Sequence, residues 1–207
     1  MYRLPERHQA RDHQVRRILV VDDEPTLRLG FAYALTGGTT EADTAANGVE
    51  ALEQMERGSY DALLLDLRMP ELDGLSVVER MREAGNGTPV ILCSAFMTLR
   101  TTLEAIRHHV VDFLIKPVKP NDLREVIAAI FATDTSPLGR SLGAVREGRL
   151  EEAVRLLESI GPEPGSAPAT WLEVLRPLAC GEPDLDTLEN SLPPDLLEQL
   201  AFHSPGG

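Results

Sequence analysis

Short, wholly apolar runs recur along the first 132 residues, and amphipathic stretches separate them. The runs show no apolar–polar alternation, which is typical of strands buried on both faces of a parallel sheet. Strands are expected at residues 17–21, 41–46, 62–66, 89–94 and 112–117, and helices at 26–35, 48–58, 75–82, 98–108 and 122–131. Asn121 is expected to cap the last helix. Strands alternating with helices at this spacing predict βαβ units and an α/β fold with a five-stranded parallel sheet.

Four of these strands end next to residues that can carry chemistry. Asp22 and Asp23 follow the first strand, Asp66 ends the third, Ser94 the fourth and Lys116 the fifth. Because crossover connections keep parallel strands in one direction, these ends should meet at one edge of the sheet. Each residue alone has a plainer interpretation, as a helix cap, a strand end or a surface lysine. Their occurrence together at matching positions favours one shared site.

The residue types at this edge suggest phosphoryl chemistry. Three neighbouring carboxylates repel one another, and a divalent cation with oxygen ligands relieves that repulsion. Mg²⁺ suits a site with few protein ligands and several waters. A phosphoryl group would lie between the cation and Lys116, with Ser94 donating a hydrogen bond. Asp66, on a central strand, is the expected nucleophile for an acyl phosphate.

Four short segments together resemble the receiver domain of bacterial two-component response regulators. They are Val20-Val21-Asp22-Asp23-Glu24, Leu65-Asp66-Leu67-Arg68-Met69-Pro70, Ser94-Ala95 and Lys116-Pro117. The resemblance covers about residues 15–132, and residues 98–116 are most similar to receivers of the nitrogen-regulation type. It implies a flavodoxin-like, doubly wound sheet with strand order 2-1-3-4-5. It also implies phosphotransfer to Asp66 from a histidine kinase or a phosphotransfer protein.

The resemblance further implies roles for individual residues. Mg²⁺ would be bound by Asp23, Asp66 and the backbone carbonyl of Arg68, with Asp22 acting through water. Ser94 and Phe113 would form a switch pair, in which the hydroxyl moves toward the phosphoryl group and the ring follows. Position 94 carries serine where threonine is more usual, and Phe113 has no hydroxyl, so a ring movement would depend on packing alone.

Composition restricts the partners and the compartment. The chain of 207 residues has a net charge of -13, and residues 133–207 alone hold 13 acids and 5 bases, so DNA is an unlikely partner. Two cysteines are too few for a disulfide framework or a zinc cluster. No stretch reaches the roughly 20 apolar residues of a membrane span, and no signal peptide is evident. A cytoplasmic location and no membrane partner are expected.

The chain divides into a flexible arm (1–14), the receiver domain (15–132), a linker (133–137) and a small acidic all-α module (138–207). Helices are expected within the module at residues 138–147, 150–160, 171–178, 185–192 and 195–202. Residues 147–157 faintly resemble half of a tetratricopeptide unit, although a solenoid needs about three repeats. Trp171, Leu172 and Leu175 are either the core of this bundle or a partner-binding face.

These observations support a phosphorylation-dependent response regulator that signals through a protein-binding module. Such a protein is not an enzyme beyond its own phosphotransfer and dephosphorylation, and it can form a homodimer. The first alternative is a DNA-binding transcriptional regulator with a divergent output domain. The second is a phosphohydrolase with Asp66 as nucleophile, which would require a second acid where Arg68 stands.

Overall fold

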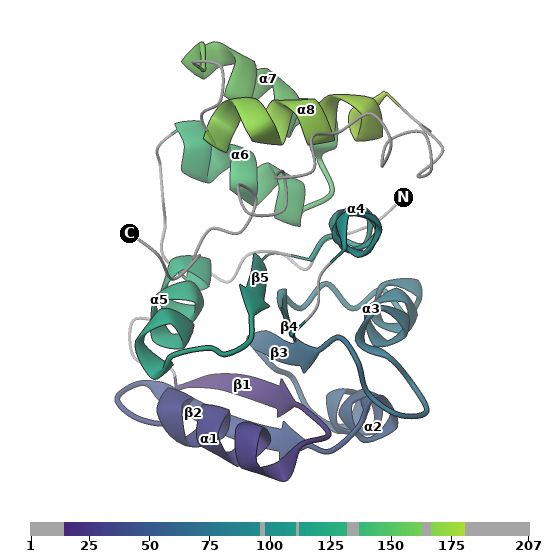
Figure 1. Cartoon of the computed structure of the whole chain (residues 1–207), viewed down its shortest axis with the longest axis vertical. Coiled ribbons are helices and arrows are strands. Elements are labelled where there is room, and N and C mark those ends of the chain that lie inside the picture. Colours follow the sequence, from purple (N-terminus) through teal and green to yellow (C-terminus); the bar gives the residue numbers. More distant parts are fainter. Residues whose placement is uncertain (1–14, 96–97, 111, 132–136, 163–166, 181–207) are drawn as a thin grey trace.

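The computed structural model describes residues 15–95, 98–110, 112–131, 137–162 and 167–180 (Figure 1). The expected arm (1–14) and the expected helices at 185–192 and 195–202 lie outside these residues. In chain order the elements are β1 (Arg16–Val21), α1 (Pro25–Leu35), β2 (Thr40–Ala45), α2 (Gly48–Arg57), β3 (Ala62–Asp66), α3 (Gly74–Glu83), β4 (Val90–Ser94), α4 (Leu99–Arg107), β5 (Asp112–Ile115), α5 (Pro120–Phe131), α6 (Pro137–Arg146), α7 (Leu150–Ile160) and α8 (Ala167–Ala179).

The five strands form one parallel sheet in the order β2-β1-β3-β4-β5, which confirms the expected fold and strand order. Val21 on β1 pairs with Leu65 on β3, so Asp22 and Asp66 occupy neighbouring register positions. Ser94 on β4 pairs with Ile115 on β5, the residue before Lys116. The register therefore brings the carboxyl ends of β1, β3, β4 and β5 to the same edge of the sheet.

Each face of the sheet has its own layer of buried apolar side chains. Ile18, Val20 and Leu64 point toward α1 and α5, whereas Leu19 and Leu63 point toward α2, α3 and α4. Successive residues of a strand point to opposite faces, so an uninterrupted apolar run is what a sheet covered on both sides requires. The apolar strands of the sequence are thus explained by helices on both sides (Figure 1).

Two expected boundaries were wrong in detail. The helix α5 begins at Pro120, so Asn121 lies inside its first turn and does not cap it. Proline suits the first helical position, because its missing N–H needs no partner there and its φ is already helical. The strand β5 ends at Ile115, so Lys116 and Pro117 follow the strand, and the ammonium of Lys116 reaches back over the sheet edge.

The C-terminal helices α6, α7 and α8 confirm that a helical region follows the sheet, and they lie on the side of α4 and β5 (Figure 1). Ala153, Leu157 and Leu175 are buried among them, so α7 contributes the apolar stripe expected from its sequence. Leu172 is also buried, which agrees with a bundle core, whereas the side chain of Trp171 lies outside the described part. Among the residues described, no helix is both long and apolar enough to cross a membrane.

Candidate functional site

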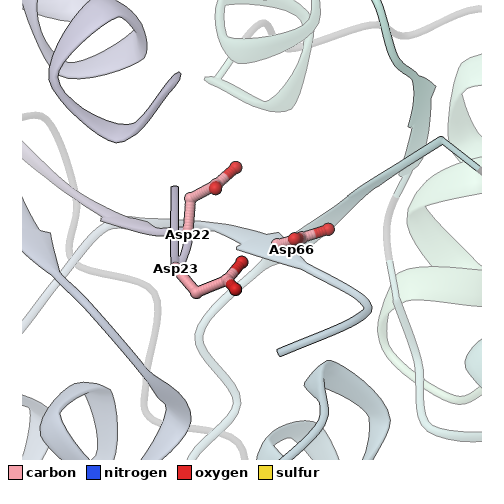
Figure 2. Close-up of side chains that lie close together, drawn as sticks. All are labelled: Asp22, Asp23 and Asp66. Carbon is pink, nitrogen blue, oxygen red and sulfur yellow. The ribbon is translucent and has the colours of Figure 1, made fainter. Parts of the chain in front are cut away.

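Three carboxylates meet at the carboxyl edge of the sheet. Asp22 and Asp23 directly follow β1, and Asp66 is the last residue of β3. Each offers an oxygen that lies within 4.8 Å of the others, and Figure 2 shows the three side chains gathered where the two strands end. Asp22 is only 2% exposed and Asp66 only 7%, whereas Asp23 is open to solvent. The structure thus brings together the three acids that the sequence placed at one edge of the sheet, and their shared role remains a prediction.

Lys116 holds two of these acids together. Its Nζ lies 2.8 Å from Oδ2 of Asp22 and 3.2 Å from Oδ2 of Asp66. Both pairs are largely withdrawn from water, which strengthens their attraction and makes the loss of either charge costly. The ammonium compensates part of the negative charge that the converging strand ends create.

The pKa of Asp66 is raised above its ordinary value, chiefly because burial disfavours the charged form. The charge and hydrogen bond of Lys116 and the backbone N–H of Arg68 lower this pKa, while the charge of Asp22 raises it further. The carboxylate therefore lies in a site where additional positive charge would be strongly favourable. A cation at this point would stabilise the ionised form.

The pKa of Lys116 is raised overall. Burial acts to lower it, but the hydrogen bond to Asp22 and the charges of Asp66 and Asp22 outweigh that effect. The ammonium form is thus the form that the site stabilises. A positive charge beside Asp66 is suited to binding an anionic group.

Arg28 fixes the loop that carries the two adjacent acids, and sequence reasoning missed it. Its Nη1 donates to the carbonyl of Asp22 at 2.7 Å, one turn into α1, and the backbone N–H of Glu24 donates to Oδ1 of Asp22 at 2.9 Å. These hydrogen bonds hold the backbone and the side chain of Asp22 in defined positions. Arginine in the first turn of a helix gives no distinctive sequence signal, because that position is usually solvent-exposed.

Gly74 was also missed, and it closes the loop after β3. A Cβ at this position would lie 2.4 Å from the carbonyl oxygen of Asp66, so no larger residue fits without moving the backbone. Its N–H donates to the carbonyl of Leu67 at 2.9 Å. The only available signal was the Asp73-Gly74 pair, in which Asp73 also caps α3 by accepting from the N–H of Ser76. The loop from 67 to 73 is therefore folded tightly against the strand end.

The remaining expected residues lie close to this edge. Ser94 ends β4, the neighbour of β3, and is 1% exposed. Phe113 lies on β5 opposite Leu92, with its ring buried in the layer under α3 and α4. Arg68 follows β3 in the loop, with an exposed side chain. Their roles in switching and in metal binding remain predictions.

The donor set fits a hard divalent cation. Oxygen ligands from three carboxylates match the preference of Mg²⁺, and the exposed side of Asp23 leaves room for the waters that this ion retains. Neither a thiol nor an imidazole belongs to the described cluster, as expected for a site that does not select a soft metal. The arrangement is suited to holding an anion between a cation and Lys116.

A family model described as the response regulator receiver domain matches residues 18–128. Among curated proteins, the regulatory protein AtoC of Escherichia coli is 39% identical over 115 residues, which make up 55% of this chain and 24% of AtoC. The alginate biosynthesis transcriptional regulatory protein AlgB of Pseudomonas aeruginosa is 32% identical over 179 residues, or 84% of this chain and 37% of AlgB. The chain thus spans well under half the length of these relatives.

Solved structures show the same fold. Response regulator TrrA of Thermotoga maritima, determined in complex with Mg²⁺ and BeF, is 34% identical with a TM-score of 0.51, covering 56% of this chain and 98% of TrrA. A Francisella receiver domain is 27% identical with a TM-score of 0.53, covering 56% of this chain and 96% of that domain. The likeness covers slightly more than half of the chain, and the family model ends before α6.

Proposed function

This chain belongs to the response regulator receiver domain family, and we propose that it is a phosphorylation-dependent response regulator that accepts a phosphoryl group on Asp66. The observation that carries the proposal is the convergence of Asp22, Asp23, Asp66 and Lys116 at one sheet edge. Asp22 and Asp66 both belong to the carboxylate cluster and both pair with Lys116, but only Asp66 lies on the central strand β3. Asp66 is therefore the proposed nucleophile.

The reaction requires little beyond this edge. A carboxylate oxygen of Asp66 attacks the phosphorus of a phosphohistidine in a histidine kinase or phosphotransfer protein. The new P–O bond forms as the P–N bond breaks, and the departing imidazole takes up a proton from solvent. Lys116 is already placed between Asp22 and Asp66, from where its ammonium can pair with an oxygen of the incoming group. Ser94 is proposed to donate to another oxygen.

Mg²⁺ is the proposed cofactor. Asp23, Asp66 and the backbone carbonyl of Arg68 would hold it directly, and Asp22 would act through water. When bound, the ion would supply positive charge that offsets the negative charge of the phosphoryl oxygens. The TrrA structure was determined in complex with Mg²⁺ and BeF, which supports the assignment here.

Signalling is proposed to pass from Asp66 to the helices that follow the receiver. Ser94 and Phe113 are the proposed switch pair, since they lie on β4 and β5 next to the site and the ring belongs to the same buried apolar layer as residues of α4. A downstream protein would then bind the C-terminal helices. In this account the chain is no enzyme beyond its own phosphotransfer, although one relative is a protein-glutamate methylesterase. A homodimer and a cytoplasmic location remain part of the proposal.

Transcriptional regulation is the second candidate. The match to AlgB, which is named a transcriptional regulatory protein, extends over 84% of this chain and so passes beyond the receiver domain. This relationship weakens the expectation from charge that DNA is not a partner. The net negative charge of residues 133–207 is the counter-argument. Gel shifts of the phosphorylated and unmodified chain across a salt series would decide between protein output and DNA output.

Phosphorylation itself is tested with the whole chain, a small acyl phosphate donor and Mg²⁺. Intact mass should show one added phosphoryl group in the unmodified sequence and none in Asp66→Asn. Asp61→Asn is the matched control, because Asp61 precedes the same strand at its opposite end. Persistent modification of the Asp66→Asn variant would refute the assignment.

A further inference from the structure

The helix α4 ends in a turn that is built from two backbone hydrogen bonds. The N–H of His109 donates to the carbonyl of Ile106, and the N–H of Val110 donates to the carbonyl of Ala105, both at 3.0 Å. This arrangement terminates a helix by placing one residue in the left-handed region, a position that glycine usually takes. Here His109 occupies it, with φ of 57°.

The helix α6 ends in the same way, with glycine in that position. The N–H of Gly148 donates to the carbonyl of Val145 at 3.0 Å, and the N–H of Arg149 donates to the carbonyl of Ala144 at 2.8 Å. Gly148 has φ of 71°. A side chain at positive φ is strained, so a histidine kept in the equivalent position of α4 calls for a reason.

The two turns lie against each other. A Cβ built on Gly148 would come within 2.5 Å of Cε1 and 2.6 Å of Nε2 of His109. The imidazole therefore packs directly on Gly148, whose φ favours glycine, and a Cβ at this position would require the ring to shift. The contact supplies the reason for the strained histidine.

Neighbouring groups hold this contact in place. Arg82, from the last turn of α3, donates to the carbonyl of His108 at 2.9 Å and to that of His109 at 3.3 Å. Beneath the turns, one continuous layer of buried apolar side chains includes Val110 from the receiver and Val145 from α6. The C-terminal helices thus pack at a defined position on the receiver domain.

We propose that the α4–β5 turn and the α6–α7 turn form the docking contact between the receiver domain and its C-terminal helices, with the His109 ring on Gly148 at its centre. The helix α4 starts five residues after Ser94, and its nine residues span roughly 14 Å to this contact. A displacement of α4 on modification of Asp66 changes the fit at Gly148. This last step rests on the proposed function, whereas the contact itself does not.

The contact is tested by hydrogen exchange of the full chain without a phosphoryl donor. Gly148→Ala introduces both backbone strain and a clash, while the control Gly161→Ala introduces strain alone, since Gly161 has φ of 62° and open space around it. Gly148→Ala should speed exchange in α6 and in the α4–β5 turn by about tenfold more than the control does. The proposal would be overturned if Gly148→Ala and Gly161→Ala sped hydrogen exchange equally and only in the C-terminal helices.

A second variant separates the ring from the backbone. His109→Gly relieves the strain at φ of 57°, so the end of α4 should be protected from hydrogen exchange at least as well as in the original chain. The helix α6 should exchange faster, because it loses its contact with the imidazole. In the His109→Gly variant, adding Gly148→Ala should speed hydrogen exchange no more than adding Gly161→Ala does, because no imidazole remains to clash with the new Cβ. A full additional effect of Gly148→Ala would contradict the proposal.

The signalling step is tested by adding the acyl phosphate donor and Mg²⁺. Protection of α6 should change on phosphorylation of the unmodified chain, and this change should disappear in Gly148→Ala. Absence of any phosphorylation would refute the proposed function and leave the contact result standing. Phosphorylation with unchanged protection of α6 would refute the docking contact as a signalling element.

Discussion

Lys116 Nζ donates a 2.8 Å hydrogen bond to Oδ2 of Asp22, joining residues that are 94 positions apart in the chain. Asp22 follows β1 and Lys116 follows β5, so the bond passes over the ends of the two strands that lie between them. Both side chains are at most 14% exposed. The pair therefore links the end of the edge strand β5 to the end of β1, across the ends of β4 and β3.

Removal of the ammonium should destabilise the fold. Lys116→Met leaves Asp22 buried without its cation, which should lower the free energy of unfolding by about 3 kcal/mol. Urea unfolding in the presence of a chelator measures this change, and Mg²⁺ should restore more stability to the variant than to the original chain. Lys119→Met is the control, since Lys119 is exposed and near the same turn. Equal stability of the two variants would argue against the role of the buried pair.

Asp23 should matter for the cation more than for the fold. Asp23→Ala removes an exposed carboxylate that is proposed to bind the ion, so Mg²⁺ should bind at least about tenfold more weakly and phosphorylation should slow. Without metal, stability should rise slightly, because repulsion among the three acids decreases. Mg²⁺ titration followed by calorimetry checks this, with the exposed Glu79→Ala as charge-matched control. An unchanged Mg²⁺ affinity of Asp23→Ala would be the contrary result.

The two cysteines should differ sharply in reactivity. Burial raises the pKa of the Cys93 thiol to about 12, so its thiolate is scarce at pH 8, whereas Cys180 is exposed. Iodoacetamide should label Cys180 in the native chain and reach Cys93 only after denaturation. Peptide mapping of the alkylated protein measures both sites. Rapid native labelling of Cys93 would show that β4 opens far more readily than the fold implies.

The stability of the chain should depend on the protonation of His109. Burial, and then the charges of Arg82 and His108, lower its pKa below the ordinary value of 6.5. The unfolded state therefore binds the proton first, and the stability present above pH 6.5 is lost as the pH falls below it. Between pH 7.5 and 5.5, the original chain should lose more stability than His109→Asn, since asparagine tolerates the positive φ. Parallel losses in both proteins would contradict this pH dependence.

The sequence predicted the sheet and the site because both follow from local patterns. Uninterrupted apolar runs such as Leu63-Leu64-Leu65 specify buried strands, and parallel connections then force Asp22, Asp66 and Ser94 to one edge. The pairing of side chains at that edge was harder to predict from the sequence. Lys116 was expected beside a phosphoryl group, but its contact with Asp22 depends on side-chain reach across two strands, which no periodicity encodes.

The position at which the C-terminal helices pack on the receiver domain could not be predicted from the sequence for a similar reason. Gly148 falls in the expected gap between the helices at 138–147 and 150–160, whereas nothing in the pattern marked His109 as a residue with positive φ. Only the packing of two turns against each other relates them. The helix α8 also began at Ala167, four residues earlier than expected, because the proline-rich segment before Trp171 includes Pro168, which is tolerated in a first helical turn.

The most direct test of the account identifies the modified atom. After incubation with the acyl phosphate donor and Mg²⁺, borohydride reduces an aspartyl phosphate to homoserine, which peptide mapping locates to a single position. We expect homoserine at position 66 alone, and none without the donor. Homoserine at position 22 or 23, or a phosphoryl group that resists reduction and maps to Ser94, would contradict the assignment of Asp66 as the phosphoacceptor.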